Sequence, residues 1–220
     1  MRKFFEIGGL VAAAALIVFG AVAISMGVSG RHTVDKSLSN EYIVASPDMT
    51  PTAIKAEATK AHIANVVKDW PTMSLVKTVN GKPTGVAIDT GARARAMAQY
   101  MHIHALEASG GLTYAQMPRY ASPNGKGTND PNAASKGPGG QPLDNPARNI
   151  WINETALATA LNTSYMASQL GLFGIVVGIA LLLSGFGFAI LAIGGALRNP
   201  ETAITFLRRS TGKTPAVPVA

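Results

Sequence analysis

Cysteine is absent from this chain of 220 residues. Its absence excludes disulfide bonds, thiolate metal sites and thiol redox chemistry. A domain of this protein outside the cytoplasm must therefore be stable through packing alone or through a partner, because no disulfide cross-links it.

Charge is missing from two long stretches, one near each end. The first runs from Phe4 to Val28 and is broken by Glu6 alone; the second lies between Glu154 and Arg198, and its residues 170–197 are almost wholly apolar. A bilayer core of about 30 Å needs about 20 apolar helical residues. Neither run alternates as a barrel strand does. The sequence predicts a two-pass membrane protein with transmembrane helices at 4–28 and 170–197.

The basic surplus lies mainly at the two tips. The chain carries 19 basic and 12 acidic residues, of which 13 and 10 fall between residues 30 and 169. Basic flanks stay in the cytoplasm. The sequence thus predicts a cell-membrane protein with residues 1–3 and a basic tail, 198–220, in the cytoplasm, and an extracytoplasmic domain at 29–169. Basic residues beside a membrane favour the lipid bilayer over nucleic acid as their partner.

The first apolar run has an alternative interpretation as a cleaved signal peptide, with Ala21-Val22-Ala23 as its cleavage site. A signal core has about 7–15 apolar residues. The run here is longer, which favours a retained transmembrane helix.

The middle domain is predicted to be helical, which makes the fold class mainly α. Thr50-Pro51 and Asn145-Pro146 each combine a capping side chain with a first-turn proline, and Thr90 caps a helix that stops at Gly110-Gly111. Asn80-Gly81 between short apolar runs predicts one short β-hairpin. Residues 117–145 are rich in Pro, Gly, Asn and Ser and predict a flexible loop, mobile or extended. A short helix with Ile204 and Leu207 is expected on the inner membrane surface.

Two histidines are the candidates for metal binding. His102 and His104 are two residues apart on a predicted helix, so their side chains point in different directions. Glu107 can join His104 at the i, i+3 spacing, which gives at most two ligands. The alternative is ordinary packing and surface histidine. No spacing in the chain selects a catalytic set, and no cofactor is predicted.

Arg93 and Arg95 are the candidates for anion binding. They stand at the start of a predicted helix, where free backbone N–H groups favour an anion such as a lipid phosphate. The alternative is a solvated helix face.

Small residues in both apolar runs predict close helix packing. Gly174 and Gly178 in the second run, and Gly9 and Ala13 in the first, are four residues apart, a spacing that lets membrane helices approach closely. Packing of the two spans on each other is the first interpretation. Self-association, or docking on another membrane protein, is the second.

Four segments resemble an uncharacterised family of actinobacterial two-pass membrane proteins, over about residues 1–195. These segments begin at Ser46-Pro-Asp-Met, Asp89-Thr-Gly-Ala, His102-Ile-His-Ala and Asn153-Glu-Thr-Ala. Members often carry the name of the small subunit of an aromatic ring-opening dioxygenase. Those enzymes are soluble and bind iron through two histidines and a carboxylate, a set that this sequence does not assemble. The resemblance implies a shared architecture and carries over no functional residue.

These observations favour a non-enzymatic accessory or interaction protein of the cell membrane, which binds a membrane protein partner or itself. One alternative is a metal- or anion-dependent enzyme at the membrane surface that uses His102 or His104, Glu107, and Arg93 or Arg95. The other is a lipid-binding module.

Overall fold

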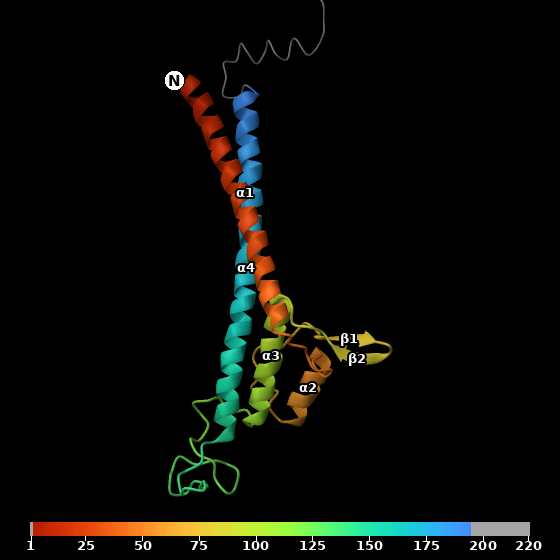
Figure 1. Cartoon of the computed structure of the whole chain (residues 1–220), viewed down its shortest axis with the longest axis vertical. Coiled ribbons are helices and arrows are strands. Elements are labelled where there is room, and N and C mark those ends of the chain that lie inside the picture. Colours follow the sequence, from red (N-terminus) through yellow and green to blue (C-terminus); the bar gives the residue numbers. More distant parts are fainter. Residues whose placement is uncertain (1, 195–220) are drawn as a thin grey trace, which may run out of the picture. The chain divides into compact units, whose positions relative to one another are not determined.

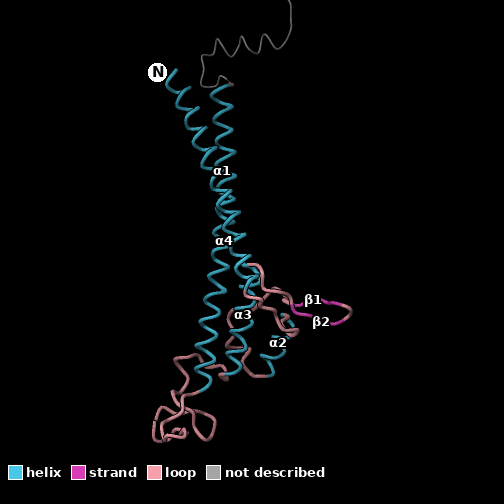
Figure 2. Tube along the Cα trace, in the orientation of Figure 1, coloured by secondary structure: helices cyan, strands magenta, loops and turns pink. Residues whose placement is uncertain are grey.

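The computed structural model describes residues 2–194. Its elements are α1 (Arg2–Asn40), α2 (Pro51–Lys60), β1 (Val76–Val79), β2 (Lys82–Gly85), α3 (Gly91–Ala108) and α4 (Pro146–Ile193). The predicted fold class is confirmed: the protein is mainly helical, with two long apolar helices and one antiparallel hairpin between them (Figure 2). The helix expected near Ile204 and the basic tail lie outside the described residues.

The chain divides into two compact units. The helix-pair unit consists of the described parts of Met1–Gly30 and Leu170–Ala220, and the middle unit is Arg31–Gln169. The helices α1 and α4 each contribute residues to both units.

Small residues seven positions apart bring α1 and α4 together in the helix-pair unit. They are Ala13, Gly20 and Gly27 on α1, and Gly171, Gly178 and Gly185 on α4. A Cβ added to Gly20 would lie 2.8 Å from the carbonyl oxygen of Gly178, and one added to Gly178 would lie 2.6 Å from that of Gly20. Because the backbones are in near contact, only glycine fits at these two positions.

Four glycines of this seam each receive a branched side chain from the opposite helix. Gly20 faces Leu182 and Gly27 faces Ile175, while Ile24 and Ile17 face Gly178 and Gly185 respectively. This is knob-into-hole packing with a seven-residue repeat, the geometry of helices that wrap around each other.

Most large side chains of the helix-pair unit point away from its seam. The most apolar 18-residue window of α1 is 11% buried and that of α4 is 17% buried. Phe4, Phe19, Phe173 and Leu183 are each more than half exposed. Both helices are long and apolar enough to cross a membrane.

The middle unit buries its large side chains around α3. Tyr100 and Ile103 of α3 pack with Ile54 of α2 and with Leu75 and Ile88 from the connecting segments, all at most 1% exposed. In Figure 1, α3 lies between α2 and the first part of α4. The Tyr100 hydroxyl donates a hydrogen bond of 3.0 Å to the carbonyl of Met73, and burial raises the pKa of Tyr100 to about 12.

Local signals set most helix ends in the middle unit. The side chains of Thr50 and Thr90 accept hydrogen bonds from backbone N–H groups in the first turns of α2 and α3, and Asn145 does the same for α4. The helix α2 ends at Lys60. His62 adopts a left-handed conformation (φ 58°), and the N–H of Ile63 bonds back to Ala58, which closes the helix as a C-terminal capping motif does.

The hairpin follows its predicted turn. Val76–Val79 pairs with Lys82–Gly85, and both Asn80 (φ 49°) and Gly81 (φ 76°) adopt the positive φ values of a type I′ turn. Beside the hairpin, Ala45 bonds to Val86, and a Cβ added to Gly85 would overlap the Ala45 carbonyl. The segment after α1 is therefore fastened to the strand that leads into α3.

The segment 117–145 folds back on itself rather than running extended. Tyr120 forms isolated bridges with both Thr128 and Asp144, and Ser135 bonds to Ala121 and Leu143. Met117 and Ala134 are buried within it. Backbone bonds substitute here for the apolar core that the composition lacks.

Candidate functional site

His102 and His104 lie on different faces of α3 and have different neighbours, as their spacing predicts. The His102 ring faces α4, whereas the His104 ring faces α2 and the segment before it. The three metal candidates inferred from the sequence, His102, His104 and Glu107, therefore do not form one site. His104 instead meets two carboxylates that the sequence analysis did not single out.

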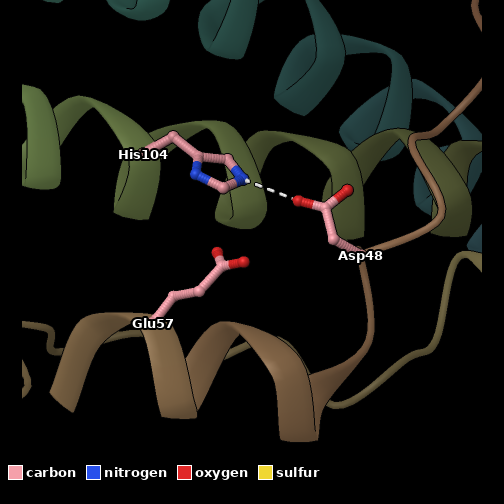
Figure 3. A group of neighbouring side chains, drawn as sticks. All are labelled: Asp48, Glu57 and His104. Carbon is pink, nitrogen blue, oxygen red and sulfur yellow. Dashed lines mark ion pairs between the residues drawn. The ribbon is translucent and has the colours of Figure 1, made fainter. Parts of the chain in front are cut away.

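His104 shares a cluster with Asp48 and Glu57 (Figure 3). One possible ligand atom from each residue lies within 4.8 Å of the other two. The Nε2 atom of His104 is 4.0 Å from an oxygen of Asp48, and Glu57 extends from α2 toward the imidazole. Three separate segments supply these residues: the connection from α1 to α2, α2 itself, and α3.

Two further residues, Ser46 and Glu107, contact the members of this cluster. The Ser46 hydroxyl donates a hydrogen bond to Asp48, which is the main reason that the pKa of Asp48 lies below its ordinary value. Glu107, one turn along α3, lies 3.6 Å from Nδ1 of His104. One imidazole nitrogen is thus beside Glu107, and the other is directed at Asp48.

His102 pairs with a buried carboxylate on α4. Its Nδ1 atom is 3.3 Å from Glu154, whose side chain is 7% exposed, and its ring meets Trp151 edge to face at 5.3 Å between centroids. The hydrogen bond with Glu154 raises the pKa of His102 and outweighs the opposite effect of burial. A buried carboxylate needs such a partner, because desolvation alone disfavours its charged form.

A polar hollow of about 360 Å³ opens beside this pair. Its lining includes Asp69, Arg95 and Asn162 together with His102 and Glu154. Arg95 pairs with Asp69 and donates a hydrogen bond of 2.9 Å to Asn162, so it joins α3 to both neighbouring segments. Charges of both signs meet here and largely neutralise one another.

Arg93 and Arg95, the candidates for anion binding, each pair with a carboxylate of this chain. Arg93 pairs with Asp89 and donates to the carbonyl of Ala87, whereas Arg95 is held by Asp69 and Asn162. Each guanidinium therefore already has a carboxylate partner, and the two groups diverge. Carboxylates nearby leave no excess positive charge to attract a phosphate.

Two apolar hollows flank the exposed side of α4 in the middle unit. One, of about 550 Å³, lies between the end of α1, α3 and α4, and is lined by Leu38, Ile43, Met97, Met101, Leu157 and Leu161 among others. The other, of about 510 Å³, is lined by Tyr114, Trp151, Ile152, Thr155, Ala156 and Thr159. The α4 face between them is accessible along its length.

The small residues predicted to pack helices behave differently from one another. Gly178 contacts Gly20 and Ile24, and the carbonyl of Ala13 lies 3.0 Å from a Cβ added to Gly185. Gly174 has a looser environment, since a Cβ added there would lie 3.5 Å from the Ala23 carbonyl oxygen, and Gly9 is half-buried. The sequence analysis did not pair Gly20 and Gly27 with this seam. Their seven-residue spacing from Ala13 is the signal that could have found them.

Comparisons of the chain with protein-family models, with curated proteins and with solved structures find no match. The functional argument therefore rests on the residues and their geometry.

Proposed function

We propose that this protein is a non-enzymatic interaction protein of the cell membrane, which crosses the bilayer twice and binds a protein partner through the exposed face of α4 in its extracytoplasmic domain. Both termini lie in the cytoplasm in this proposal. The observation that carries it is the complete lack of charge on that exposed face.

Burial supports the membrane part of the proposal. The core helix of a soluble protein passes the same length and hydropathy test, but it is mostly buried. Here 11% and 17% of the apolar windows are buried, and the large side chains project outward. Exposed apolar surface on this scale is stable in lipid and aggregates in water. The basic residues Arg2, Lys3, Arg198, Arg208, Arg209 and Lys213 support the cytoplasmic placement of both ends.

The α4 face supports the binding part. Within the middle unit α4 buries one stripe, with Glu154, Leu161 and Ser168 seven residues apart. Its remaining surface includes Ile152, Leu157 and Met166, which are 48%, 54% and 58% exposed. None of the residues 155–169 is charged. A surface helix in water normally carries charge on its outer face.

The side chains on this face suit a protein partner. Ala156, Thr159, Ala160 and Thr163 are small and exposed, so another helix can approach closely, while the flanking hollows offer apolar pockets for larger side chains. Uncharged interface cores with apolar pockets are where association energy concentrates. A surface without charge offers little to an ionic ligand, which is why binding of a protein is favoured over binding of a charged small molecule.

One substitution pair tests this proposal. Ala156→Arg places a charge on the α4 face, and Ala56→Arg places the same charge on an exposed position of α2. In native membranes treated with a crosslinker and solubilised in mild detergent, wild type and Ala56→Arg should retain one reproducible species that Ala156→Arg loses. Its mass separates a second copy of the chain from a different protein. Capture that is equal in all three chains, or an isolated monomer in every case, contradicts the proposal.

A further inference from the structure

We propose that Asp48, Glu57 and His104 form a binding site for a divalent transition-metal ion, of which Zn²⁺ is the representative. The site is independent of the α4 face and of the function proposed for it. It ties together three segments of a domain in which no disulfide can do so.

The donor set fits this class of ion. One imidazole nitrogen and two carboxylate oxygens are ligands that Zn²⁺ accepts, at about 2.0–2.2 Å from the metal. Ligand atoms around a tetrahedral ion at that radius are about 3.3 Å apart. The donors here lie within 4.8 Å of one another, and the Asp48–His104 pair is at 4.0 Å. Small rotations of half-exposed side chains close that difference. Ca²⁺ requires six to eight oxygen ligands, more than this site supplies.

The orientation of His104 fits as well. Metal-bound histidines commonly donate their second N–H to a carboxylate, which fixes the tautomer and directs the free nitrogen at the ion. Glu107 lies 3.6 Å from Nδ1, and Nε2 is directed at Asp48 (Figure 3). Glu107 was a ligand candidate from the sequence, and its geometry makes it a positioning residue for His104.

The excess of carboxylates around His104 also favours a bound cation. Asp48, Glu57 and Glu107 surround one histidine, and no lysine or arginine among residues 2–194 forms an ion pair with any of the three carboxylates. Elsewhere in the middle unit, Asp69 and Asp89 each have an arginine partner. The hydrogen bond from Ser46 keeps Asp48 ionised. The cluster is therefore a concentrated negative charge that a divalent cation would neutralise.

The test uses the full-length, untagged protein in mild detergent, stripped of metal and titrated with ZnCl₂ by calorimetry. One Zn²⁺ per chain is expected, together with a rise in the thermal midpoint of the middle unit. His104→Ala and Glu57→Gln should each weaken binding by at least about 100-fold, and Glu107→Gln by about 10- to 100-fold, as expected for an outer carboxylate.

Matched controls separate this site from adventitious binding. Glu41→Gln removes an exposed carboxylate near the cluster in sequence, and His62→Asn removes an exposed histidine whose left-handed backbone asparagine tolerates. Both should bind Zn²⁺ as wild type does. Glu57→Gln keeps its fold, since the Glu57 side chain forms no hydrogen bond or ion pair with the described residues, and circular dichroism checks this. Absence of stoichiometric binding, or binding that survives in both His104→Ala and Glu57→Gln, overturns the proposal.

Discussion

The two units of this protein bury opposite kinds of residue. In the helix-pair unit the interior is made of glycine and alanine, and the phenylalanines and leucines face outward. In the middle unit the interior is made of tyrosine, isoleucine and leucine, and charged side chains such as Glu41, Lys55 and Lys60 lie on the outside. The difference follows from the surroundings each unit needs. Lipid gives helices no hydrophobic reason to associate, so close backbone contact must supply it, whereas water drives large apolar side chains inward.

The α4 face in the middle unit fits neither pattern. It is exposed as an outer surface is, yet it lacks the charges of a surface in water and the density of large side chains seen on the helix-pair unit. This contrast with both units is the basis of the proposal that a protein covers the α4 face. The substitutions below test how far the contrast between the units holds.

Gly20→Leu should have the largest effect. Its Cβ would lie 2.8 Å from the Gly178 carbonyl and 2.9 Å from Leu182, so the two helices must separate. We expect a loss of about 1–3 kcal/mol in the free energy of unfolding, the usual cost of overpacking. Thermal unfolding in mild detergent, followed by circular dichroism, measures it.

Gly187→Leu is the matched control for that substitution. A Cβ at Gly187 meets nothing within 4 Å, and both changes gain the same helix propensity. The control should unfold at or above the wild-type temperature. Equal losses in the two variants would show that the glycine seam does not hold the pair together.

The elements of the fold were predictable because their signals are local. Thr50-Pro51, Thr90 and Asn145-Pro146 cap helices within three residues of themselves, and Asn80-Gly81 dictates its own turn. The seam and the candidate sites depend on partners distant in the chain. The seven-residue spacing of Gly20 from Ala13 indicates a seam position, but it does not show that Gly178 is the partner. Likewise, no spacing within α3 shows that Asp48 and Glu57 lie beside His104. The spacing of His102 and His104 did predict that their side chains diverge.

Glu154 is another residue whose environment depends on a partner distant in the chain. In the sequence it is only the last charged residue before a long uncharged run, and nothing nearby indicates that it is buried. Its burial follows from its place on the inner stripe of α4, seven residues before Leu161, opposite His102 of α3.

The His102–Glu154 pair should make the middle unit sensitive to pH. The pKa of His102 is raised in the folded protein, so the pair stabilises the fold fully below the unfolded pKa of about 6.5. That stability is lost as pH rises through the folded pKa. The slope is at most about 1.4 kcal/mol per pH unit for one proton. Denaturant unfolding between pH 5 and 9 measures it.

Glu154→Gln should remove most of this pH dependence, because the amide carries no charge to hold the proton on His102. Asp69 also favours the charged imidazole and leaves a smaller residual slope. The described residues of the helix-pair unit include no histidine. A pH slope that is unchanged in Glu154→Gln would assign the dependence to another group.

Arg95→Lys should have the smallest effect and sharpens the contrast at the surface of the middle unit. Arg95 joins Asp69 and Asn162 through two different nitrogens, a fork that lysine cannot reproduce. Its side chain is 37% exposed, so screening by water limits the loss of stability to about 0.5–1 kcal/mol.

Arg93→Lys is the control. Arg93 pairs with a residue four positions back along its own segment, so this substitution should cost less stability. Denaturant unfolding at low and at high salt measures both variants, and the Arg95 effect should shrink as salt rises. If the two variants lose equal stability at low salt, Arg95 does not tie α3 to α4.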